Sequence, residues 1–377
     1  MNFNLHEHEK MIQRTARDFT ENVVRPVAAE IDDRCEFPSD LVLEMAGIGY
    51  LGLPYPSRYG GEDAGYTGNV LVIEQLSRAS MLAGAIIGVH GLAEEALFRY
   101  GSDVQKHDFL EPLSRGDMLS SFAFTEAATG SDPRAIETRA RRDGDDYIIT
   151  GQKQFVALAP ASQLTLVFAK NESERLSAFV VENSSDGYNI RIPCGTMGVR
   201  GLCPSVVYLD DVRVPKGNLI GKPGAGYKIM LETISAGKLA VSAQAVGVGQ
   251  GALDLSLDYA RERKAYGKPV GDMLSIKWLL AEMASRIEAS RLLTYKAAFD
   301  RDAGAGIAKE SAVAKLFASQ AAVEVTHMAM QIHGAYGYMK EMEIERLYRD
   351  AKLTEIYEGV SEIQRVIIAD HLLRENA

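Results

Sequence analysis

A glutamate near the C-terminus is the residue of this sequence best suited to act as a base. In IYEGVSEIQR, residues 356–365, Glu358 follows Tyr357 and precedes Gly359. Burial disfavours the charged form of a carboxylate and raises its pKa, which makes it a stronger base. The glycine removes bulk beside it and lets a bound molecule approach the backbone. The pattern suits abstraction of a weakly acidic proton, whereas the ordinary alternative is an exposed glutamate at a helix end.

Three further stretches carry groups that suit a polar ring or a phosphate. SFAFTEAATGSDPRAIET, residues 121–138, joins aromatics to a Thr-Gly-Ser-Asp turn with hydroxyl and N–H groups. RERKAYGKPVG, residues 261–271, has a cationic cluster, and QIHGAYGYMKE, residues 331–341, has glycines flanked by aromatics. Taken singly, these stretches are also typical of an Asx-type turn, a basic helix end and a glycine helix cap.

The elements that must position these groups fall into three units. Residues 1–120 show helical periodicity, residues 121–226 contain short β-branched and aromatic runs separated by turn residues, and residues 227–377 are helical again. In the last unit Ile276, Leu280, Met283 and Ile287 mark one helix face, as packing in a bundle requires. The length of 377 residues likewise predicts two or three domains.

Composition predicts an ordinary globular protein. The net charge of −10 disfavours nucleic acid and anionic membranes as partners. Three cysteines, Cys35, Cys194 and Cys203, indicate neither a disulfide framework nor a metal site. The N-terminus lacks an apolar targeting segment, and we expect no apolar run of membrane length and a cytoplasmic location.

One nucleotide-binding pattern is discarded. GIGYLG, residues 47–52, fits G-x-G-x-x-G, but a helical pattern precedes it and a segment with two prolines follows it. A dinucleotide site needs a strand before the motif and a helix after it. We therefore expect a helix that ends at a glycine here.

Together and in this order, the motifs resemble the acyl-CoA dehydrogenase family over essentially the whole chain. The matching motifs are FAFTEAATGSD, GQKQF, MGVRG with DDVRVP, ERKAYG, QIHGAYGY and IYEGVSEIQR. The resemblance implies an α+β fold with an N-terminal helical domain, a middle β-barrel-like domain and a C-terminal four-helix bundle. It also implies an FAD enzyme in which Glu358 removes the α-proton of an acyl-CoA thioester while the β-hydride passes to flavin N5. The Glu358 N–H would then bond the thioester oxygen.

The same resemblance implies the binding residues. It assigns FAD contacts to Phe122, Phe124, Thr125, Ser131, Phe155, Ala157, Arg263, Tyr266, Gln331, Gly334, Ala335, Val360 and Glu362. It assigns substrate contacts to Ser131, Lys238, Tyr357 and Gly359. Arg263 would meet the pyrophosphate and the 331–335 loop the adenine half, across a subunit boundary. The implied partners are an electron-transferring flavoprotein and further copies of the chain, as a homotetramer or homodimer.

Several positions depart from the family pattern. Ala157 replaces a threonine whose hydroxyl approaches flavin N5, Val360 a common threonine and Ala127 a common proline. The family's Asp-x-x-Arg near the CoA end is Ser235 to Lys238 here, which keeps a positive charge but loses the planar fork. Gly237 occupies the position where some members carry their base, and since glycine cannot serve, Glu358 has no rival.

Two alternative functions follow from the departures and from the fold. The altered flavin contacts at Ala157 favour an oxygen-using oxidase or monooxygenase relative. A non-catalytic acyl-CoA-binding scaffold would keep the fold without binding FAD. The acyl pocket is expected along residues 84–102, where no arginine precedes Arg99, so a dicarboxylic acyl group is disfavoured.

Overall fold

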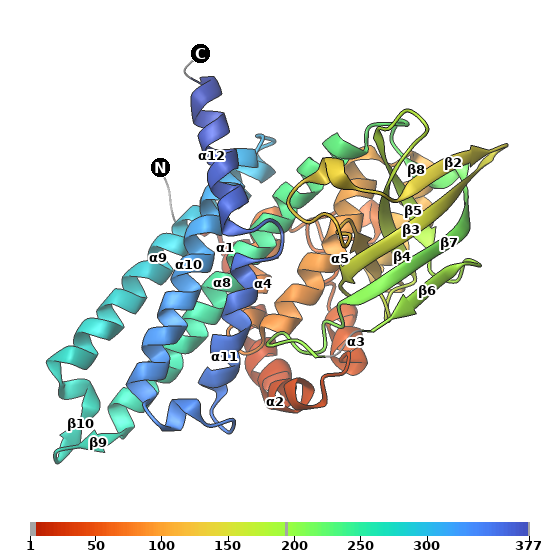
Figure 1. Cartoon of the computed structure of the whole chain (residues 1–377). Coiled ribbons are helices and arrows are strands. Elements are labelled where there is room, and N and C mark those ends of the chain that lie inside the picture. The colour runs from red at the N-terminus through yellow and green to blue at the C-terminus, as the bar shows by residue number, and fades with distance from the viewer. Residues whose placement is uncertain (1–4, 193–194, 376–377) are drawn as a thin grey trace.

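A computed structural model describes residues 5–192 and 195–375 of the chain. In chain order it contains a group of helices, a β sheet and a second group of helices (Figure 1). The expected α+β order is therefore confirmed. Cys194 lies outside the described residues, and Cys35 and Cys203 are free thiols.

The N-terminal unit is built from short helices around one long apolar one. Its helical elements are α1 (Glu7–Phe19), η1 (Thr20–Val24), α2 (Arg25–Arg34), α3 (Ser39–Gly47), η2 (Ser57–Tyr59), α4 (Gly65–Ser77), α5 (Met81–Tyr100), α6 (Asp103–Gln105), η3 (Lys106–Leu110) and α7 (Glu111–Arg115). Helix α3 ends at Gly47, and Gly49 has a left-handed φ of 77°. The discarded nucleotide motif is thus a glycine-rich helix end, as predicted.

Helix α5 has the length and hydropathy that a membrane span requires. The expectation that the sequence contains no apolar run of membrane length was therefore wrong. Of the apolar window in this helix, 83% is buried inside the protein. Ile86 and Leu92 are among its core side chains. The apolar character of α5 is therefore accounted for by packing in the core of the molecule.

The middle unit is an eight-stranded, mainly antiparallel sheet. Its strands are β1 (Ser120–Ala123), β2 (Arg139–Asp143), β3 (Asp146–Val156), β4 (Leu164–Lys170), β5 (Leu176–Glu182), β6 (Tyr188–Arg191), β7 (Ser205–Pro215) and β8 (Leu219–Ile220). The order is β6-β7-β3-β2-β4-β5-β8, with β1 parallel to β4. Two single turns, η4 (Pro133–Ala135) and η5 (Lys216–Asn218), connect strands.

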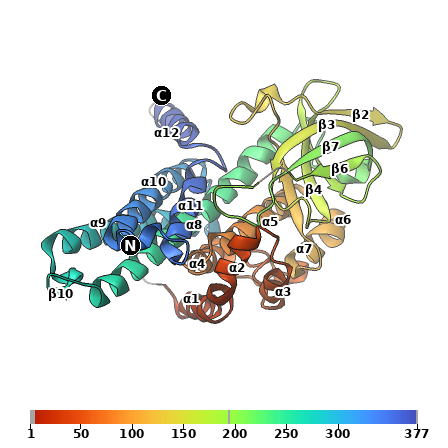
Figure 2. The ribbon, with the colours of Figure 1, turned by 60° about the horizontal axis from the view of Figure 1, so that its bottom comes forward.

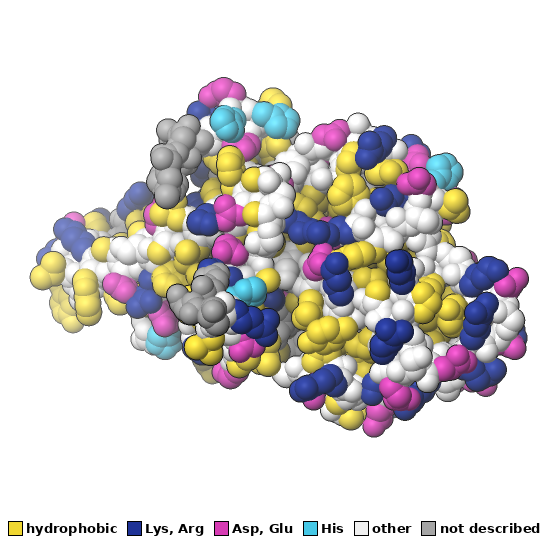
Figure 3. All heavy atoms as spheres, turned by 90° about the horizontal axis from the view of Figure 1, so that it is seen from above, with side chains coloured by type: hydrophobic (Ala, Val, Ile, Leu, Met, Phe, Trp, Pro, Cys, Tyr) yellow, Lys and Arg dark blue, Asp and Glu magenta, His cyan; other side chains and the backbone are white. Residues whose placement is uncertain are grey.

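Strand β4 is buried on both faces, which explains its almost continuous apolar sequence. Val167 and Phe179 face a core shared with β3 and β7, so the sheet packs on itself. Leu166 and Phe168 face the opposite side, in a core that includes Leu97 of α5. The β unit is thereby fixed against the N-terminal helices. On the face shown in Figure 3, basic and acidic side chains are interspersed over the strands, as on a solvated surface.

The C-terminal unit is organised around the 37-residue helix α8. Its elements are α8 (Gly226–Glu262), β9 (Lys264–Ala265), β10 (Lys268–Pro269), η6 (Val270–Asp272), α9 (Leu274–Asp302), α10 (Ala308–His333), η7 (Tyr336–Tyr338), α11 (Glu343–Ala351), η8 (Lys352–Glu355) and α12 (Ser361–Glu375). Helix α8 packs against α4, α5, α9 and α10. Met283 and Ile287 of α9 are fully buried, and Ile276 and Leu280 pack against the same core, as the predicted face requires.

The two helical units share one hydrophobic core. Ile73 of α4, Ile86 of α5 and Val246 of α8 belong to it together with Ile287 of α9. A Cβ at Gly247 would lie 2.3 Å from the Glu74 carbonyl oxygen, so glycine lets α8 and α4 cross closely. Figure 2 shows the N-terminal helices lying between the sheet and the C-terminal helices, with α12 extending away from the body.

Candidate active site

A cleft of about 890 Å³ lies between the β unit, α8 and the segment from η8 to α12. A volume of this size is typical of a small-molecule or cofactor site. The cleft brings together most of the residues predicted from sequence. The lining includes Phe122, Phe124, Thr125, Ser131, Phe155, Ala157, Lys238, Tyr357, Glu358, Gly359 and Val360.

A tight backbone turn presents Glu358 to this cleft. Glu358 has a φ of 53° and Gly359 a φ of 88°, so two consecutive residues are left-handed between η8 and α12. Such a conformation is unfavourable for a non-glycine residue and needs support from its surroundings. Lys315 Nζ and Gln364 Nε2 supply it by donating to the Gly359 carbonyl oxygen, at 2.7 and 2.8 Å.

The Glu358 carboxyl group packs against a glycine and is short of partners. A Cβ at Gly237 would lie 2.8 Å from Glu358 Oε2, so the missing side chain leaves room for the base. Oε2 is buried and has no hydrogen-bond partner among the described residues. Burial raises the pKa of Glu358 to about 7, against the opposing charges of Lys315 and Lys238. A base with such a pKa is matched to proton transfer near neutral pH.

Two buried lysines flank this carboxyl group. Burial lowers the pKa of Lys238 to about 8, while the charge of Glu358 acts in the opposite direction. Burial also lowers the pKa of Lys315 to about 8. The structure thus places Lys238 close enough to Glu358 for their charges to interact, whereas the family motif predicted it toward the CoA end. A planar guanidinium is absent at this position, and a compact ammonium takes its place.

A buried ion pair anchors the loop that follows β1. Lys153 Nζ donates to Glu126 Oε1 at 2.7 Å and to the Phe124 carbonyl oxygen at 3.3 Å. The side chains of Lys153 and Glu126 are 0% and 4% exposed. Glu126 also accepts from the hydroxyl and N–H of Thr138 and from the N–H of Glu137. This network fixes the backbone that carries Phe124 and Thr125.

The residues on this side of the cleft fit a planar aromatic cofactor. Phe155 is 69% exposed and has a φ of 55°, so a large apolar ring stands free at the cleft. Free aromatic surface of this kind is the chemistry that stacks on a flavin ring. Thr125 and Ser131 line the same side and offer hydroxyl groups, and Ala157 lies among them without one. FAD would be held here by Phe155 and by the loop after β1.

Other predicted cofactor residues lie apart from the cleft. Arg263 follows the end of α8, and Tyr266 is 96% exposed at the turn between β9 and β10. Gln331, Gly334 and Ala335 lie at the end of α10, whereas Glu362 is on α12. The members that do not line the cleft are Arg263, Tyr266, Gln331, Gly334, Ala335 and Glu362. Figure 1 places β9 and β10 at the end of the helical unit remote from the sheet. One chain therefore presents the predicted contacts at separate places.

Two predicted residues have a different environment from that expected. The Tyr357 hydroxyl donates to Gln244 Oε1 on α8, so only the remainder of this side chain is available to the cleft. Glu362 is exposed on α12 and lies 4.0 Å from Arg365 rather than at the cleft.

Three residues that bond the Glu358 segment were not predicted from the sequence. Lys315 is fully buried and holds the Gly359 carbonyl, and Gln244 and Gln364 bond the same segment. A signal for Lys315 existed, since it lies four residues after Ser311 and three before Ala318 on a face of small residues. A lysine on such a face is rarely buried without a partner.

Comparison with known proteins agrees with this geometry. Family models match as the acyl-CoA dehydrogenase N-terminal domain at residues 6–117, the middle domain at 121–212 and the C-terminal domain at 224–373. The acryloyl-CoA reductase (NADH) of Anaerotignum propionicum is 39% identical, over 99% of this chain and 96% of its own. The mitochondrial short-chain specific acyl-CoA dehydrogenase of Rattus norvegicus is 38% identical, over 98% and 91%.

A solved structure has the same fold throughout. The butyryl-CoA dehydrogenase of Megasphaera elsdenii aligns with a TM-score of 0.97 at 32% identity, over 99% of this chain and 100% of that one. The similarity thus extends over all three units. The chain belongs to the acyl-CoA dehydrogenase family, whose members are FAD-dependent oxidoreductases that act on CH–CH bonds.

Proposed function

We propose that this protein catalyses α,β-dehydrogenation of an acyl-CoA thioester, with Glu358 as the base that removes the α-proton. One observation carries the proposal. One oxygen of the Glu358 carboxyl group, Oε2, is buried without a hydrogen-bond partner in the described part of the chain, at a cleft that the predicted flavin residues also line. A carboxyl group held this way is available to a bound molecule rather than engaged in the fold.

Different residues of the chain have different roles in the proposed reaction. Bound FAD supplies the acceptor for the hydride that leaves the β-carbon. Glu358 takes the α-proton, and its own N–H would donate to the thioester oxygen and so favour loss of that proton. Lys315 and Gln364 hold the Gly359 carbonyl and keep the turn in place. Closure of the cleft by substrate excludes water from the carboxyl group.

The direction of the reaction and the electron partner belong to this proposal. Dehydrogenation would pass electrons to an electron-transferring flavoprotein. A relative named as an acryloyl-CoA reductase supports the reverse direction at the same site. In the reverse direction Glu358 would return a proton to the α-carbon. A carboxyl group with a pKa near 7 can act as the base in one direction and as the acid in the other.

Anaerobic flavin spectra test the proposed function. The purified protein should be yellow, and one class among short, medium, branched and cyclic acyl-CoA esters should bleach it. Because Ala157 cannot offer a hydroxyl to the flavin, oxygen consumption should be followed with the same ester. Rapid oxygen consumption would favour the oxidase alternative, and a colourless protein that cannot be reconstituted with FAD would contradict the proposal.

Removal of the Lys238 charge should shift the pH dependence of the reaction. The positive charge of Lys238 lowers the pKa of Glu358, so Lys238→Met should raise it further. Glu358 is active when ionised, so kcat/KM of the native enzyme falls as pH drops through about 7. In Lys238→Met this fall in kcat/KM at acidic pH should occur at higher pH, so kcat/KM at pH 7 should be lower than in the native enzyme. Lys238→Arg keeps the charge, so its kcat/KM should fall at the same pH as in the native enzyme. If kcat/KM of Lys238→Met also falls at the native pH, Lys238 does not lower the pKa of Glu358.

We further propose that the native enzyme is a homo-oligomer in the cytoplasm. The separate position of Arg263 and Tyr266 supports cofactor binding between copies of the chain. In one chain, the Arg263 guanidinium lies 5.5 Å from the centre of the Tyr336 ring and is otherwise open to solvent. A homotetramer or a homodimer would bring this group to the FAD of a neighbouring copy.

A further inference from the structure

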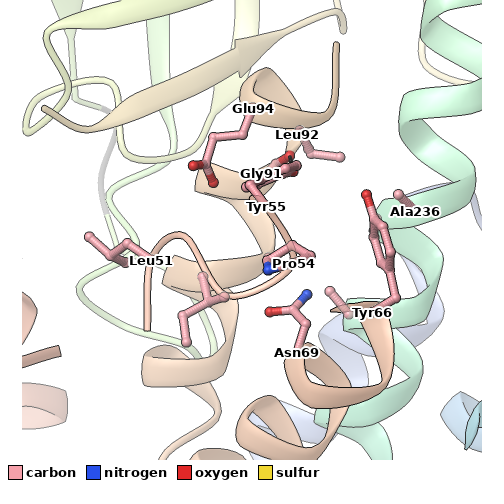
Figure 4. Close-up of a pocket in the computed structure, with 13 residues that line it drawn as sticks. Leu51, Pro54, Tyr55, Tyr66, Asn69, Gly91, Leu92, Glu94 and Ala236 are labelled. Atoms are coloured by element: carbon pink, nitrogen blue, oxygen red, sulfur yellow. Dashed lines mark hydrogen bonds between the residues drawn. The ribbon is translucent and has the colours of Figure 1, made fainter. Parts of the chain in front are cut away.

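A second, small cavity lies behind the base. Its volume is about 20 Å³, and its lining includes Tyr55, Asn69, Gly91, Glu94 and Gly237 (Figure 4). A space of this volume holds one water-sized group. The lining comes from the loop after α3, from α4, from α5 and from α8, so the cavity lies where the N-terminal helices meet the C-terminal unit.

The cavity adjoins the position of the reaction. Leu92 lines both this cavity and the cleft. A Cβ at Gly237 would lie 2.8 Å from Glu358 Oε2 and 2.8 Å from Leu92 Cδ2. Gly237 and Leu92 thus form the thin wall between the carboxyl group of the base and the cavity. For an acyl group with its α-carbon at Glu358 to enter the cavity, its distal end must pass Leu92, which lines both spaces.

Glu94 places a polar group in the lining of this cavity. Its side chain is fully buried, and Oε1 accepts a hydrogen bond from Ser114 Oγ at 2.9 Å. Oε2 has no hydrogen-bond partner within the described ranges. Burial raises the pKa of Glu94 well above its usual value, which favours the neutral acid, an O–H donor.

The neighbouring histidine does not satisfy this oxygen. His90 Nε2 lies 3.5 Å from Glu94 Oε2. His90 Nδ1 accepts from the Ser120 N–H at 3.1 Å, so the ring proton is on Nε2. That single proton is directed to the Leu113 carbonyl oxygen, at 3.2 Å. Burial lowers the pKa of His90 to about 4, so the ring carries no second proton at neutral pH.

Asn69 provides a second polar atom without a partner. Its Oδ1 is buried and accepts no hydrogen bond from the residues that the structure describes. Figure 4 shows Glu94 and Asn69 at opposite ends of the group of residues drawn, and both line the cavity. A Cβ at Gly91, which also lines the cavity, would meet no atom within 4 Å, so there is open space beside this residue. Two buried polar atoms without partners are costly to leave unpaired.

We propose that this cavity binds a hydroxyl group at the distal end of a short acyl chain, so that the substrate is a hydroxyacyl-CoA. A hydroxyl is water-sized, donates once and accepts twice, and therefore suits both Asn69 Oδ1 and the Glu94 acid. The two orientations of the Asn69 amide present either its oxygen or its NH2 group to the cavity. A hydroxyl can pair with both, because it donates and accepts. This inference rests on the proposed function and names its substrate class.

Other end groups match less well. A methyl group would leave both polar atoms unpaired, at a cost that rejects it. A carboxylate would be buried without an ionic partner, because the described residues that line the cavity include no lysine or arginine. An ammonium group would require ionisation of Glu94 in an apolar environment.

Matched esters test the inference on the FAD-loaded enzyme. We would measure kcat/KM for anaerobic flavin reduction by acyl-CoA esters of four to six carbons that end in methyl, hydroxyl, amino or carboxyl groups. At one chain length the hydroxyl ester should exceed the methyl ester by about 10- to 100-fold. A preference for methyl, amino or carboxyl at every length would overturn the inference and leave the proposed function intact. If no ester reduces the flavin, the proposed function fails and this inference fails with it.

Variants separate recognition from folding. Glu94→Leu and Asn69→Leu should each lower the hydroxyl-to-methyl ratio toward one. Asn22→Leu is the matched control, because Asn22 is exposed and lines neither the cavity nor the cleft, and it should keep the ratio. If Glu94→Leu does not fold, Glu94→Met keeps the length of the side chain without a polar end group and should still lower the ratio. An unchanged ratio in both Asn69→Leu and the Glu94 variant would overturn the inference.

Discussion

Replacement of Glu358 by glutamine should leave FAD and acyl-CoA binding in place and nearly abolish flavin reduction. Glutamine has almost the same shape, but its amide cannot accept the α-proton. General base catalysis contributes about 10²- to 10⁴-fold, so we expect a loss of that order in the rate of anaerobic flavin reduction. The buried position of Glu358 Oε2 at the cleft makes this the largest effect expected of any single substitution here.

A neighbouring glutamate provides the control for this experiment. Glu355 lies three residues earlier in η8 and bonds Lys352 at 2.5 Å. It is absent from the lining of the cleft, so Glu355→Gln should reduce flavin at close to the native rate. Stopped-flow absorbance gives the rate, and a shift of the flavin spectrum on ligand addition reports binding. Normal reduction in Glu358→Gln would contradict the assignment of the base.

Replacement of Lys153 by methionine should destabilise the protein strongly and weaken FAD binding. The substitution leaves Glu126 buried with only neutral donors, from Thr138 and Glu137. Removing one member of a buried ion pair costs about 3 to 5 kcal/mol. The loop that carries Phe124 and Thr125 would lose its anchor as well, because Lys153 also bonds the Phe124 carbonyl. Denaturant unfolding and FAD titration measure the two effects.

An exposed lysine of the same unit is the matched control. Lys216 bonds Asp145 at 2.5 Å, and its side chain is 60% exposed. Exposed ion pairs contribute about 0 to 1 kcal/mol, so Lys216→Met should change stability little. Equal destabilisation by the two substitutions would show that the Lys153–Glu126 pair has no special role in the β unit.

The order of the units and the proposal of Glu358 as the base follow from short-range patterns. Helix and strand periodicity separate the β unit from its helical neighbours, and IYEGVSEIQR together with the other motifs identifies Glu358. What sequence reasoning did not supply depends on long-range packing. Glu358 has a left-handed backbone conformation. The hydrogen bond from Lys315 to the Gly359 carbonyl oxygen supports this turn and joins residues 44 positions apart in the sequence. Periodicity contains no information about such a contact.

The environment of charged residues was equally inaccessible from local pattern. Lys238 belongs to an apolar helix, and only the crossing of α8 with the Glu358 turn places it close enough to Glu358 for their charges to interact. Glu94 belongs to the most apolar helix of the N-terminal unit, where a glutamate would ordinarily be exposed. Its burial beside a small cavity appears only once α4, α5 and α8 are packed together. The assignment of the remote FAD contacts stays a prediction.

Deuterium at the substrate α-carbon tests the central claim most directly. An acyl-CoA ester that bleaches the flavin would be compared, without oxygen, with the same ester carrying two deuterium atoms at the α-carbon. If Glu358 removes the α-proton as flavin is reduced, the deuterated ester should reduce the flavin clearly more slowly in a single turnover. Equal rates for both esters, with deuterium at the β-carbon slowing the reaction alone, would show that α-proton removal does not limit flavin reduction and would contradict the account of Glu358.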